Sequence, residues 1–432
     1  MKIIVVGAGL AGLACALRLA GTGCEVLLLE SSDSVGGRVR TDVVDGFRLD
    51  RGFQVLFTEY PSLPNVVDIG ALELRRYDPG ALIAQGDRLH VFSDPARDPD
   101  SLRAALLSNV VPFADKLRAW RLSAELSAKP VSAILDGPDQ TIERFLRRRG
   151  FSERFLETFA RPFFGGIFLD RTLAASAQRF QYYWKMLVDG ETAVPALGMG
   201  ELPRAMARAL EVSIEIRTGS AVTGLMRRAG KVVGVETADG NLPADAVVLA
   251  TDPRTAATLS GLPFPTDTRG VDTVWIATTE PVVPGRKIVL HANQAPIVNH
   301  FAPVSNVAPD TAPEGWHLGA ACVLARSSHD DESLGRSVLA DCARMFSGDA
   351  RSLRALRDAR IVAIHRIPHA QCFAAPGQHM MRVPTDPGIP GLRLAGEAIG
   401  GASIDGAIRS GIDAASSLLE LANPGTNPTT TG

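Results

Sequence analysis

Residues 3–41 read IIVVGAGLAGLACALRLAGTGCEVLLLESSDSVGGRVRT, and this stretch decides the fold of the chain. Its first four residues are apolar and β-branched, which predicts a strand buried on both faces of a parallel sheet. A G-x-G-x-x-G turn follows at 7–12, and apolar residues then recur with the spacing of one helix face. A second strand is predicted over Glu25–Leu29. This order of strand, glycine turn, helix and strand predicts a Rossmann-like α/β domain.

Each glycine of the turn has its own physical role at a pyrophosphate site. Gly7 permits the tight turn from strand to helix, Gly9 lets the backbone approach the phosphates, and Gly12 lets the helix pack closely on the strand. The first helical residues, Leu10 and Ala11, present free N–H groups and the positive end of the helix dipole to the same anion. The turn therefore predicts a dinucleotide site, and the alternative is a strand-to-helix turn without a ligand.

An acidic residue and a second glycine turn indicate which dinucleotide is bound. Glu30 ends the second strand, close to the spacing of about 20 residues expected for an acid that binds ribose hydroxyls. An arginine there would have favoured a 2′-phosphate. Gly37 and Arg38 then form a second turn, where the backbone can approach the pyrophosphate and the guanidinium can neutralise it. A simple nicotinamide dehydrogenase does not need this turn, so the sequence favours FAD over NAD.

The whole segment resembles the FAD fingerprint of the flavin amine oxidase superfamily, which includes monoamine oxidases, protoporphyrinogen oxidases and phytoene desaturases. The resemblance implies non-covalently bound FAD. It also implies that Gly52, Phe53 and Gln54 lie beside the flavin ring, although Phe53 is equally well interpreted as a core residue. A valine at the position of Val222 would meet the adenine through its backbone.

A second motif lies near the C-terminus, where a predicted strand ends in Gly396 and Glu397 and a glycine-rich loop leads into the last helix. This resembles the closing motif of the same superfamily. By that resemblance Glu397 binds the ribitol chain, and the backbone of Asp405, Gly406 and Ala407 faces the pyrimidine edge of the flavin. A helix N-terminus at this edge would stabilise the negative charge of the reduced flavin. The alternative is a final helix without a special role.

Length and composition limit the class of protein. A chain of 432 residues is expected to hold two domains, or three by size alone. The net charge of −2 implies no nucleic-acid partner. The five cysteines are scattered and odd in number, which predicts reduced thiols in a cytoplasmic protein and no metal site. We expect neither a signal peptide nor a transmembrane segment; peripheral membrane contact and the oligomeric state stay open.

The chain is predicted to alternate between two domains. The FAD-binding domain combines residues 1–75, 196–265 and 366–422, and the substrate domain combines 76–195 and 266–365. The substrate domain is expected to be α+β, with a helical part over 95–210 and a mixed sheet. The tail at 423–432 is expected to be disordered. In the mixed sheet, strands are predicted over Val271–Thr279, Lys287–His291, Val298–Val304, His317–Ala325 and Arg360–His365, with a helix over Ser333–Phe346.

Three residues are candidates for lining a substrate cavity. Tyr183 and Trp184 belong to the densest aromatic cluster of the chain, and His300 lies in a predicted strand. Core packing is the alternative for each of them. The sequence also contains a basic cluster, which is either a solvated helix face or a docking site for an acidic partner or membrane, at Arg144, Arg147, Arg148 and Arg149.

The expected reaction is hydride removal from a C–H bond of a small apolar or amine substrate to flavin N5, with oxygen or another acceptor taking the electrons. Amine oxidases commonly place a lysine near N5, but the strand at 271–279 has none and Lys287 is a poor substitute. Ala398, Ile399 and Gly400 stand where those enzymes commonly have an aromatic residue. These departures favour desaturation or porphyrinogen-type oxidation.

Three alternatives remain open at this stage. They are a flavin-containing polyene isomerase, a flavin-binding protein without turnover, and an NAD-dependent dehydrogenase. The sequence does not indicate a catalytic side chain, because the redox centre would be the flavin itself.

Overall fold

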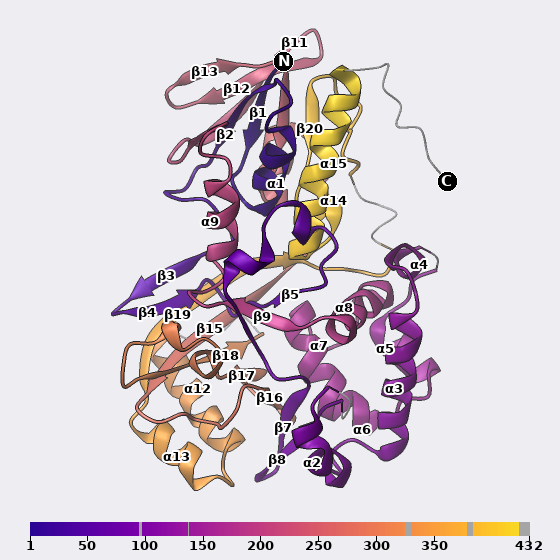
Figure 1. Cartoon of the computed structure of the whole chain (residues 1–432), viewed down its shortest axis with the longest axis vertical. Helices are drawn as coiled ribbons and strands as arrows, with labels where there is room; N and C mark the ends of the chain where they lie inside the picture. The colour runs from indigo at the N-terminus through magenta and orange to yellow at the C-terminus, as the bar shows by residue number, and fades with distance from the viewer. Residues whose placement is uncertain (95–96, 137, 325–327, 329, 378–382, 423–432) are drawn as a thin grey trace.

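The computed structural model describes residues 1–94, 97–136, 138–324, 328, 330–377 and 383–422. A parallel sheet occupies one end of the elongated molecule, and a mixed sheet with a helical part occupies the other end (Figure 1). The tail at 423–432 lies outside the described residues. The predicted α/β class with mixed sheets and helices is confirmed.

The first strand lies in the middle of a five-stranded sheet whose neighbouring strands all run parallel. Ile3 and Val5 belong to one apolar cluster, while Ile4 and Val6 belong to another on the opposite face. The predicted burial of both faces is therefore correct. In spatial order the strands are β10 (Glu215–Arg217), β2 (Glu25–Leu29), β1 (Lys2–Val6), β14 (Ala246–Leu249) and β20 (Leu392–Leu394).

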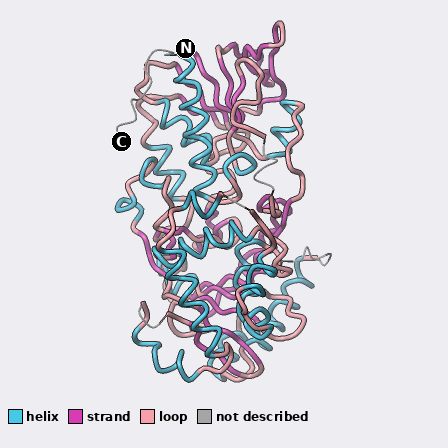
Figure 2. Tube along the Cα trace, turned by 90° about the vertical axis from the view of Figure 1, so that its right-hand side faces the viewer, coloured by secondary structure: helices cyan, strands magenta, loops and turns pink. Residues whose placement is uncertain are grey.

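Two helices cover one face of this sheet and a small antiparallel sheet covers the other (Figure 2). Helix α15 approaches α1 so closely that a Cβ at Gly411 would lie 2.0 Å from the Ala11 carbonyl oxygen. Strands of this antiparallel sheet form a hairpin across Gly230. These elements are α1 (Leu10–Leu19), α15 (Ile404–Ala422), β11 (Val222–Arg228), β12 (Lys231–Thr237) and β13 (Gly240–Pro243).

The second large sheet has seven strands and is mixed, because β16 and β7 run parallel while the other neighbouring pairs are antiparallel. Strands β7 and β8 were not predicted. In spatial order the sheet contains β19 (Arg360–Cys372), β15 (Thr268–Thr278), β18 (His317–Val323), β17 (His300–Ala302), β16 (Ile288–His291), β7 (Ala81–Gln85) and β8 (Arg88–Phe92).

The strand predicted over Val298–Val304 is wrong at both ends. Strand β17 covers only His300–Ala302, and helix α11 (Val304–Val307) starts directly after Pro303. Proline has no N–H group for a strand ladder and is well tolerated before a helix, which explains the early end. Strand β19 is longer than predicted and continues through position 366, where we placed a domain boundary.

The helical part predicted over 95–210 is present and packs on the mixed sheet through β8 (Figure 1). Its helices are α2 (Leu102–Leu107), α3 (Phe113–Ser127), α4 (Val131–Leu135), α5 (Ile142–Arg148), α6 (Glu153–Phe155), α7 (Arg161–Phe168) and α8 (Ala177–Asp189), with one π-helical turn at Leu156–Ala160.

The remaining strands and α-helices lie in both halves of the molecule and between them. The strands are β3 (Thr41–Val44), β4 (Phe47–Asp50), β5 (Leu56–Phe57), β6 (Leu74–Arg76) and β9 (Thr192–Pro195). The helices are α9 (Glu201–Arg208), α10 (Pro253–Ser260), α12 (Asp331–Met345), α13 (Ala350–Arg357) and α14 (Glu397–Gly400).

Candidate functional site

The two glycine turns of the N-terminal segment meet beside the carboxyl end of β1. The Gly36 N–H donates to the Ala8 carbonyl oxygen over 2.8 Å, and Gly9 and Gly36 form an isolated parallel bridge. Gly37 has a φ of +59°, and a Cβ there would lie 3.4 Å from the Cα of Gly9. Two backbone segments predicted to approach one pyrophosphate are therefore neighbours, at the edge where parallel α/β sheets bind ligands.

The three glycines of the first turn are required for different reasons. A Cβ at Gly12 would lie 1.8 Å from the Gly7 carbonyl oxygen, and Gly7 itself has a φ of +100°. The fold therefore requires both residues. Around Gly9, which is the N-cap of α1, a Cβ would meet no described atom within 4 Å. No side chain caps α1 and its first turn has no acidic residue, so the residues fit an external anion at this helix end.

The carboxylate of Glu30 is held against the first turn. Its side chain is buried and accepts hydrogen bonds from the Ala8 N–H at 2.8 Å and from the N–H and hydroxyl of Ser32 at 2.9 and 2.7 Å. The Ser220 N–H donates to the Glu30 carbonyl oxygen over 2.8 Å, which brings the start of β11 and Val222 to the same edge. Glu30 and Val222, which were predicted to contact the ribose and the adenine, thus lie at the same edge of the sheet.

The predicted cofactor residues from the two ends of the chain contact each other directly. The Arg38 guanidinium lies 2.7 Å from a carboxylate oxygen of Glu397, and it also donates to the Ala370 carbonyl oxygen over 2.7 Å. The second oxygen of Glu397 accepts the Cys372 N–H at 3.0 Å. The Gln54 amide donates to the Arg38 carbonyl oxygen over 2.9 Å. One ion pair therefore connects the second glycine turn with the C-terminal motif.

The glycine-rich loop packs tightly on the start of α15. Gly396 has a φ of +118°. A Cβ at Gly406 would lie 2.3 Å from the Gly401 carbonyl oxygen. The hydroxyl of Ser403 accepts the Gly406 N–H at 2.8 Å, and its carbonyl oxygen accepts the Ala407 N–H at 3.0 Å. The loop conformation thus depends on small residues and on a serine cap at the helix N-terminus.

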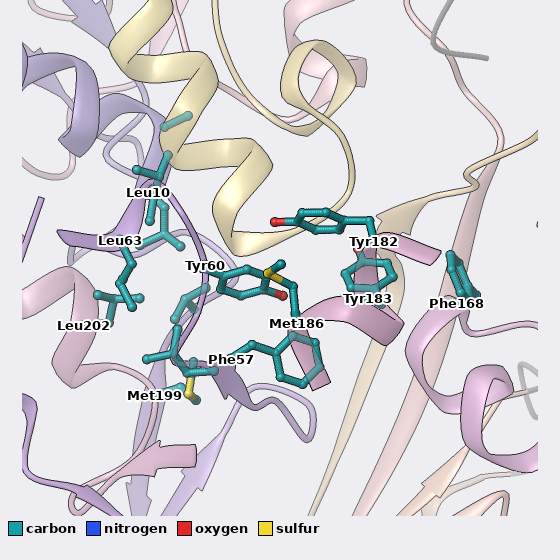
Figure 3. Packing of buried hydrophobic residues seen from close by; sticks show 14 of the residues in the cluster. Leu10, Phe57, Tyr60, Leu63, Phe168, Tyr182, Tyr183, Met186, Met199 and Leu202 are labelled. Carbon is teal, nitrogen blue, oxygen red and sulfur yellow. The ribbon is translucent and has the colours of Figure 1, made fainter. Parts of the chain in front are cut away.

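The side chain of Asp405 points away from the loop and into the interface with α8. Its carboxylate accepts the Tyr182 hydroxyl at 2.9 Å and the Ser62 N–H at 2.8 Å. Figure 3 shows the Tyr182 hydroxyl directed toward α15. The sequence analysis did not identify Tyr182 and Ser62 as site residues. The density of aromatic residues at 181–184 was a signal for the first of them, and nothing local indicated the second.

The neighbouring aromatic residues of α8 point in different directions. The Tyr183 hydroxyl donates to the Ala402 carbonyl oxygen over 2.5 Å, and burial raises the pKa of Tyr183 to about 12. Trp184 instead donates to the Ser123 hydroxyl over 3.0 Å and stacks on Phe164 at a centroid distance of 5.6 Å. Tyr183 therefore lies at the C-terminal loop, whereas the position of Trp184 favours a packing role in the helical part.

Phe53 and His300, which were predicted independently, form a pair. Their rings meet edge to face with a distance of 5.5 Å between the ring centroids. Phe53 directly follows Gly52, whose φ is +84°. Burial, with a contribution from the Arg171 charge, lowers the pKa of His300 to about 4. The imidazole is therefore neutral at physiological pH, so His300 adds no charge next to Phe53.

A buried carboxyl group three residues before Phe53, that of Asp50, was also not predicted. Asp50 ends β4 and accepts hydrogen bonds from the Thr41 hydroxyl at 2.6 Å and the Met199 N–H at 2.9 Å. Burial raises the pKa of Asp50 to about 7, against the lowering effect of these two hydrogen bonds. The Asp-x-Gly pattern at 50–52 is a local signal for this residue, whereas its burial arises from the packing of β3 and β4 against the loop before α9.

We predict that Asp50→Asn increases stability more at high pH than at low pH. A folded-state pKa raised above the unfolded value of about 3.9 means that wild-type stability falls as pH rises through about 4 to 7. The asparagine does not titrate, so the variant should gain up to about 4 kcal/mol over the wild type between pH 4 and pH 8. Urea unfolding of both proteins across this range measures the difference. A difference that is constant with pH would contradict the prediction.

Among the described residues, no group of three histidine, cysteine, aspartate or glutamate side chains could hold a metal ion, and no helix is long and apolar enough to cross a membrane. The site is thus built from glycine turns, one helix N-terminus at each end of the chain, and the acids Glu30 and Glu397.

Comparison with known proteins agrees with this geometry. The family model for "Flavin containing amine oxidoreductase" matches residues 10–419. The chain is 30% identical over 299 residues to the hydroxyneurosporene desaturase of Cereibacter sphaeroides, covering 60% of this chain and 57% of that protein. It is 32% identical over 284 residues to the phytoene dehydrogenase of Streptomyces griseus, covering 58% and 54%. The chain thus matches somewhat more than half the length of these curated relatives.

Solved structures with the same fold extend over nearly the whole chain. A crystal structure from Exiguobacterium sp. 255-15, named as a candidate protoporphyrinogen oxidase, has a TM-score of 0.74 at 20% identity. The match covers 98% of this chain and 99% of the chain in that structure. A putrescine oxidase bound to putrescine has a TM-score of 0.69 at 19% identity and covers 97% and 99%. At these identities the likeness establishes the fold alone.

Proposed function

This chain belongs to the flavin containing amine oxidoreductase family, and from that premise we propose that it is an enzyme that binds FAD non-covalently and oxidises an apolar substrate. The observation that carries the proposal is the convergence of both glycine turns, Glu30, the Arg38–Glu397 ion pair and the start of α15 on one edge of the parallel sheet. Such an edge is where open α/β sheets bind dinucleotides.

Each part of FAD has a matching group in the chain. The N-terminus of α1 and Arg38 would hold the pyrophosphate, Glu30 the adenosine ribose, and the backbone near Val222 the adenine. Glu397 would hold the ribitol, and the first turn of α15 would face the pyrimidine edge. Non-covalent binding is supported by Cys372 beside Glu397, because burial raises the pKa of this thiol to about 12 and leaves it a poor nucleophile.

We propose that the parallel sheet belongs to a FAD-binding domain formed by 1–75, 196–265 and 366–422, and the mixed sheet to a substrate domain formed by 76–195 and 266–365. This division is supported by the strand membership of the two sheets except at 366, because β19 of the mixed sheet continues to Cys372. The contacts of α8 with the C-terminal loop then join the two domains beside the flavin position.

The substrate is proposed to be apolar, with a C–C bond as the site of oxidation. Strand β15 has no lysine, and the ammonium of Lys287 is paired with Asp98 at 2.9 Å. Phe53 and the neutral His300 pair with each other, and neither supplies a negative charge to an amine cation. The relatives named for desaturation of hydroxyneurosporene and dehydrogenation of phytoene agree with an apolar polyene.

When bound, the flavin would supply the acceptor for the hydride that leaves the substrate carbon. In that reaction the neighbouring carbon would lose a proton to solvent, a C–C single bond would become a double bond, and oxygen or another acceptor would then take the two electrons. The chain contributes orientation and electrostatics. The positive dipole end of α15 would face the edge where negative charge develops, while Ser403 already accepts the Gly406 and Ala407 N–H groups.

Anaerobic mixing tests the proposed reaction. We expect FAD-loaded protein to lose its oxidised flavin absorbance with phytoene in detergent micelles, and to keep it with putrescine at the same concentration. Bleaching by putrescine alone would overturn the apolar assignment. Conversion of the polyene without bleaching would indicate an isomerase, and a colourless protein that takes up no FAD on reconstitution would refute the cofactor assignment.

A further inference from the structure

Two arginines from distant parts of the chain meet at the glycine-rich loop before α15. Arg179 lies on α8 and Arg409 lies on α15. Their guanidinium groups donate to the same oxygen, that of the Gly400 carbonyl, over 3.5 and 2.8 Å. The two Nη2 atoms are therefore separated by at most about 6 Å, the sum of these two distances. Two positive charges thus lie next to each other at the end of α14.

The guanidinium of Arg179 packs directly on this loop. Gly401 has a φ of +108°, and a Cβ there would lie 2.6 Å from Nη2 of Arg179. Burial, together with the charge of Arg409, lowers the pKa of Arg179 below its usual value. The surroundings of Arg179 therefore disfavour its positive charge unless an anion compensates it.

The acidic side chains around the two arginines are already engaged elsewhere. Asp139 attracts Arg179 from a distance, but its carboxylate accepts three backbone N–H groups over 2.8–3.2 Å. The carboxylate of Asp405 accepts a tyrosine hydroxyl and a backbone N–H. Asp413 attracts Arg409 from one turn further along α15 without forming an ion pair with it. The residues outside the described ranges include no aspartate or glutamate, so no carboxylate side chain of the chain pairs directly with these arginines.

Capping of α14 is the alternative role for the two arginines. Basic side chains commonly donate to the last carbonyl oxygens of a helix, and Gly400 is the last residue of α14. The bond from Arg409 is sufficient for this role, whereas the 3.5 Å bond from Arg179 is at the limit of a hydrogen bond. A guanidinium has several N–H groups, and each of these side chains donates one hydrogen bond to the described residues. Capping therefore leaves most of the donors without an acceptor.

We propose that Arg179 and Arg409 bind a small anion, a carboxylate or a phosphate group, between α8 and the glycine-rich loop. A guanidinium can direct two parallel N–H donors at the oxygens of such a group. Both side chains are only partly buried, so an anion can reach them from solvent. The anion would neutralise the two like charges and hold α8 against the loop. This inference is independent of the reaction proposed above, because the site requires neither FAD nor hydride transfer.

Unfolding of the full chain in phosphate buffers tests the site. When inorganic phosphate replaces chloride at constant ionic strength, wild-type stability should rise along a saturating curve, because the anion binds the folded state. The double variant Arg179→Gln/Arg409→Gln should need about ten-fold or more phosphate for the same effect, since it loses charge-assisted hydrogen bonds. Arg228→Gln, which changes an exposed arginine on β11, is the matched control and should behave as the wild type. The general stabilising effect of phosphate on proteins is common to all three.

The comparison between chloride and phosphate separates anion binding from capping. With anion binding, the stability difference between the wild type and the double variant should grow as phosphate is added. In chloride, Arg179→Gln alone should lose little or no stability, because one of two adjacent like charges is removed. A stability difference of the same size in chloride and in phosphate would indicate capping and would overturn the proposal.

Two carboxylates identify the source of the anion. Repeating the unfolding assay with sodium acetate and sodium octanoate compares a free anion with the carboxylate of an apolar molecule. Half-saturation at a lower concentration of octanoate, lost in the double variant, would support an anionic group carried by an apolar ligand. Equal half-saturation would support a free anion. The absence of saturable stabilisation by phosphate and by both carboxylates would overturn the proposal, and the flavin content of each sample keeps this result separate from the cofactor assignment.

Discussion

Replacing Glu30 by alanine is expected to weaken FAD binding roughly 10- to 150-fold, which corresponds to about 1.5–3 kcal/mol for hydrogen bonds to a charged group. The carboxylate is buried at the first turn and already accepts the Ala8 and Ser32 N–H groups. Its loss would remove the proposed ribose acceptor and would also loosen the backbone proposed to face the pyrophosphate. Titration of the apoprotein with FAD, followed by flavin fluorescence, measures the change.

Two further variants separate these contributions. Glu30→Gln keeps an oxygen that can accept the Ala8 N–H but removes the charge, so its affinity should lie between those of the wild type and the alanine variant. Glu25→Ala is the matched control, because Glu25 lies at the other end of β2 and its exposed side chain pairs with Lys2. Unchanged FAD affinity in Glu30→Ala would refute the assignment of this residue to the ribose.

Substituting alanine at two glycines of the same turn should produce opposite phenotypes. Gly12→Ala should destabilise the protein by about 3 kcal/mol or more, with or without FAD, because its Cβ would lie 1.8 Å from the Gly7 carbonyl oxygen and α1 must move away from β1. Gly9→Ala should leave the apoprotein folded with nearly wild-type stability, because its Cβ meets no described atom.

The cost of Gly9→Ala should appear only in cofactor binding. Its methyl group would occupy the space that the pyrophosphate needs, so FAD affinity should fall about ten-fold or more. Urea unfolding of the apoproteins and FAD titration distinguish the two variants. Equal loss of apoprotein stability in both, or wild-type FAD affinity in Gly9→Ala, would contradict a phosphate site at this turn.

Structural features that depend on short segments could be predicted from the sequence. The strand buried on both faces of the parallel sheet, the two glycine turns and the last helix, which begins at Ile404, follow from local patterns, because glycine and β-branched residues restrict the backbone within a few positions. The spacing of Glu30 from the first turn was informative for the same reason. Each of these features lies within one βα unit or one loop.

Features that depend on packing between distant segments could not be predicted in this way. The carboxylate of Asp405 binds Tyr182 and Ser62, and neither partner is near it in sequence. The raised pKa of Asp50 results from burial under another loop. Strand β7 forms a tight hairpin with β8 across Gly86 and Asp87, a local signal that was missed, whereas its parallel partner β16 lies about 200 residues further along the chain.

The position of β20 has a consequence for synthesis of the protein on the ribosome. This strand pairs with β14, yet Leu249 and its partner Leu394 are separated by the second segment of the proposed substrate domain, 266–365. At about 5–20 residues per second, the edge of β14 remains unpaired for on the order of 10 s after it is translated. During that time the nascent chain exposes an apolar strand edge, and helix α15 is not yet available to cover α1. A chaperone that covers this strand edge during the interval would therefore increase the yield of folded protein. Cofactor binding would follow release of the chain from the ribosome.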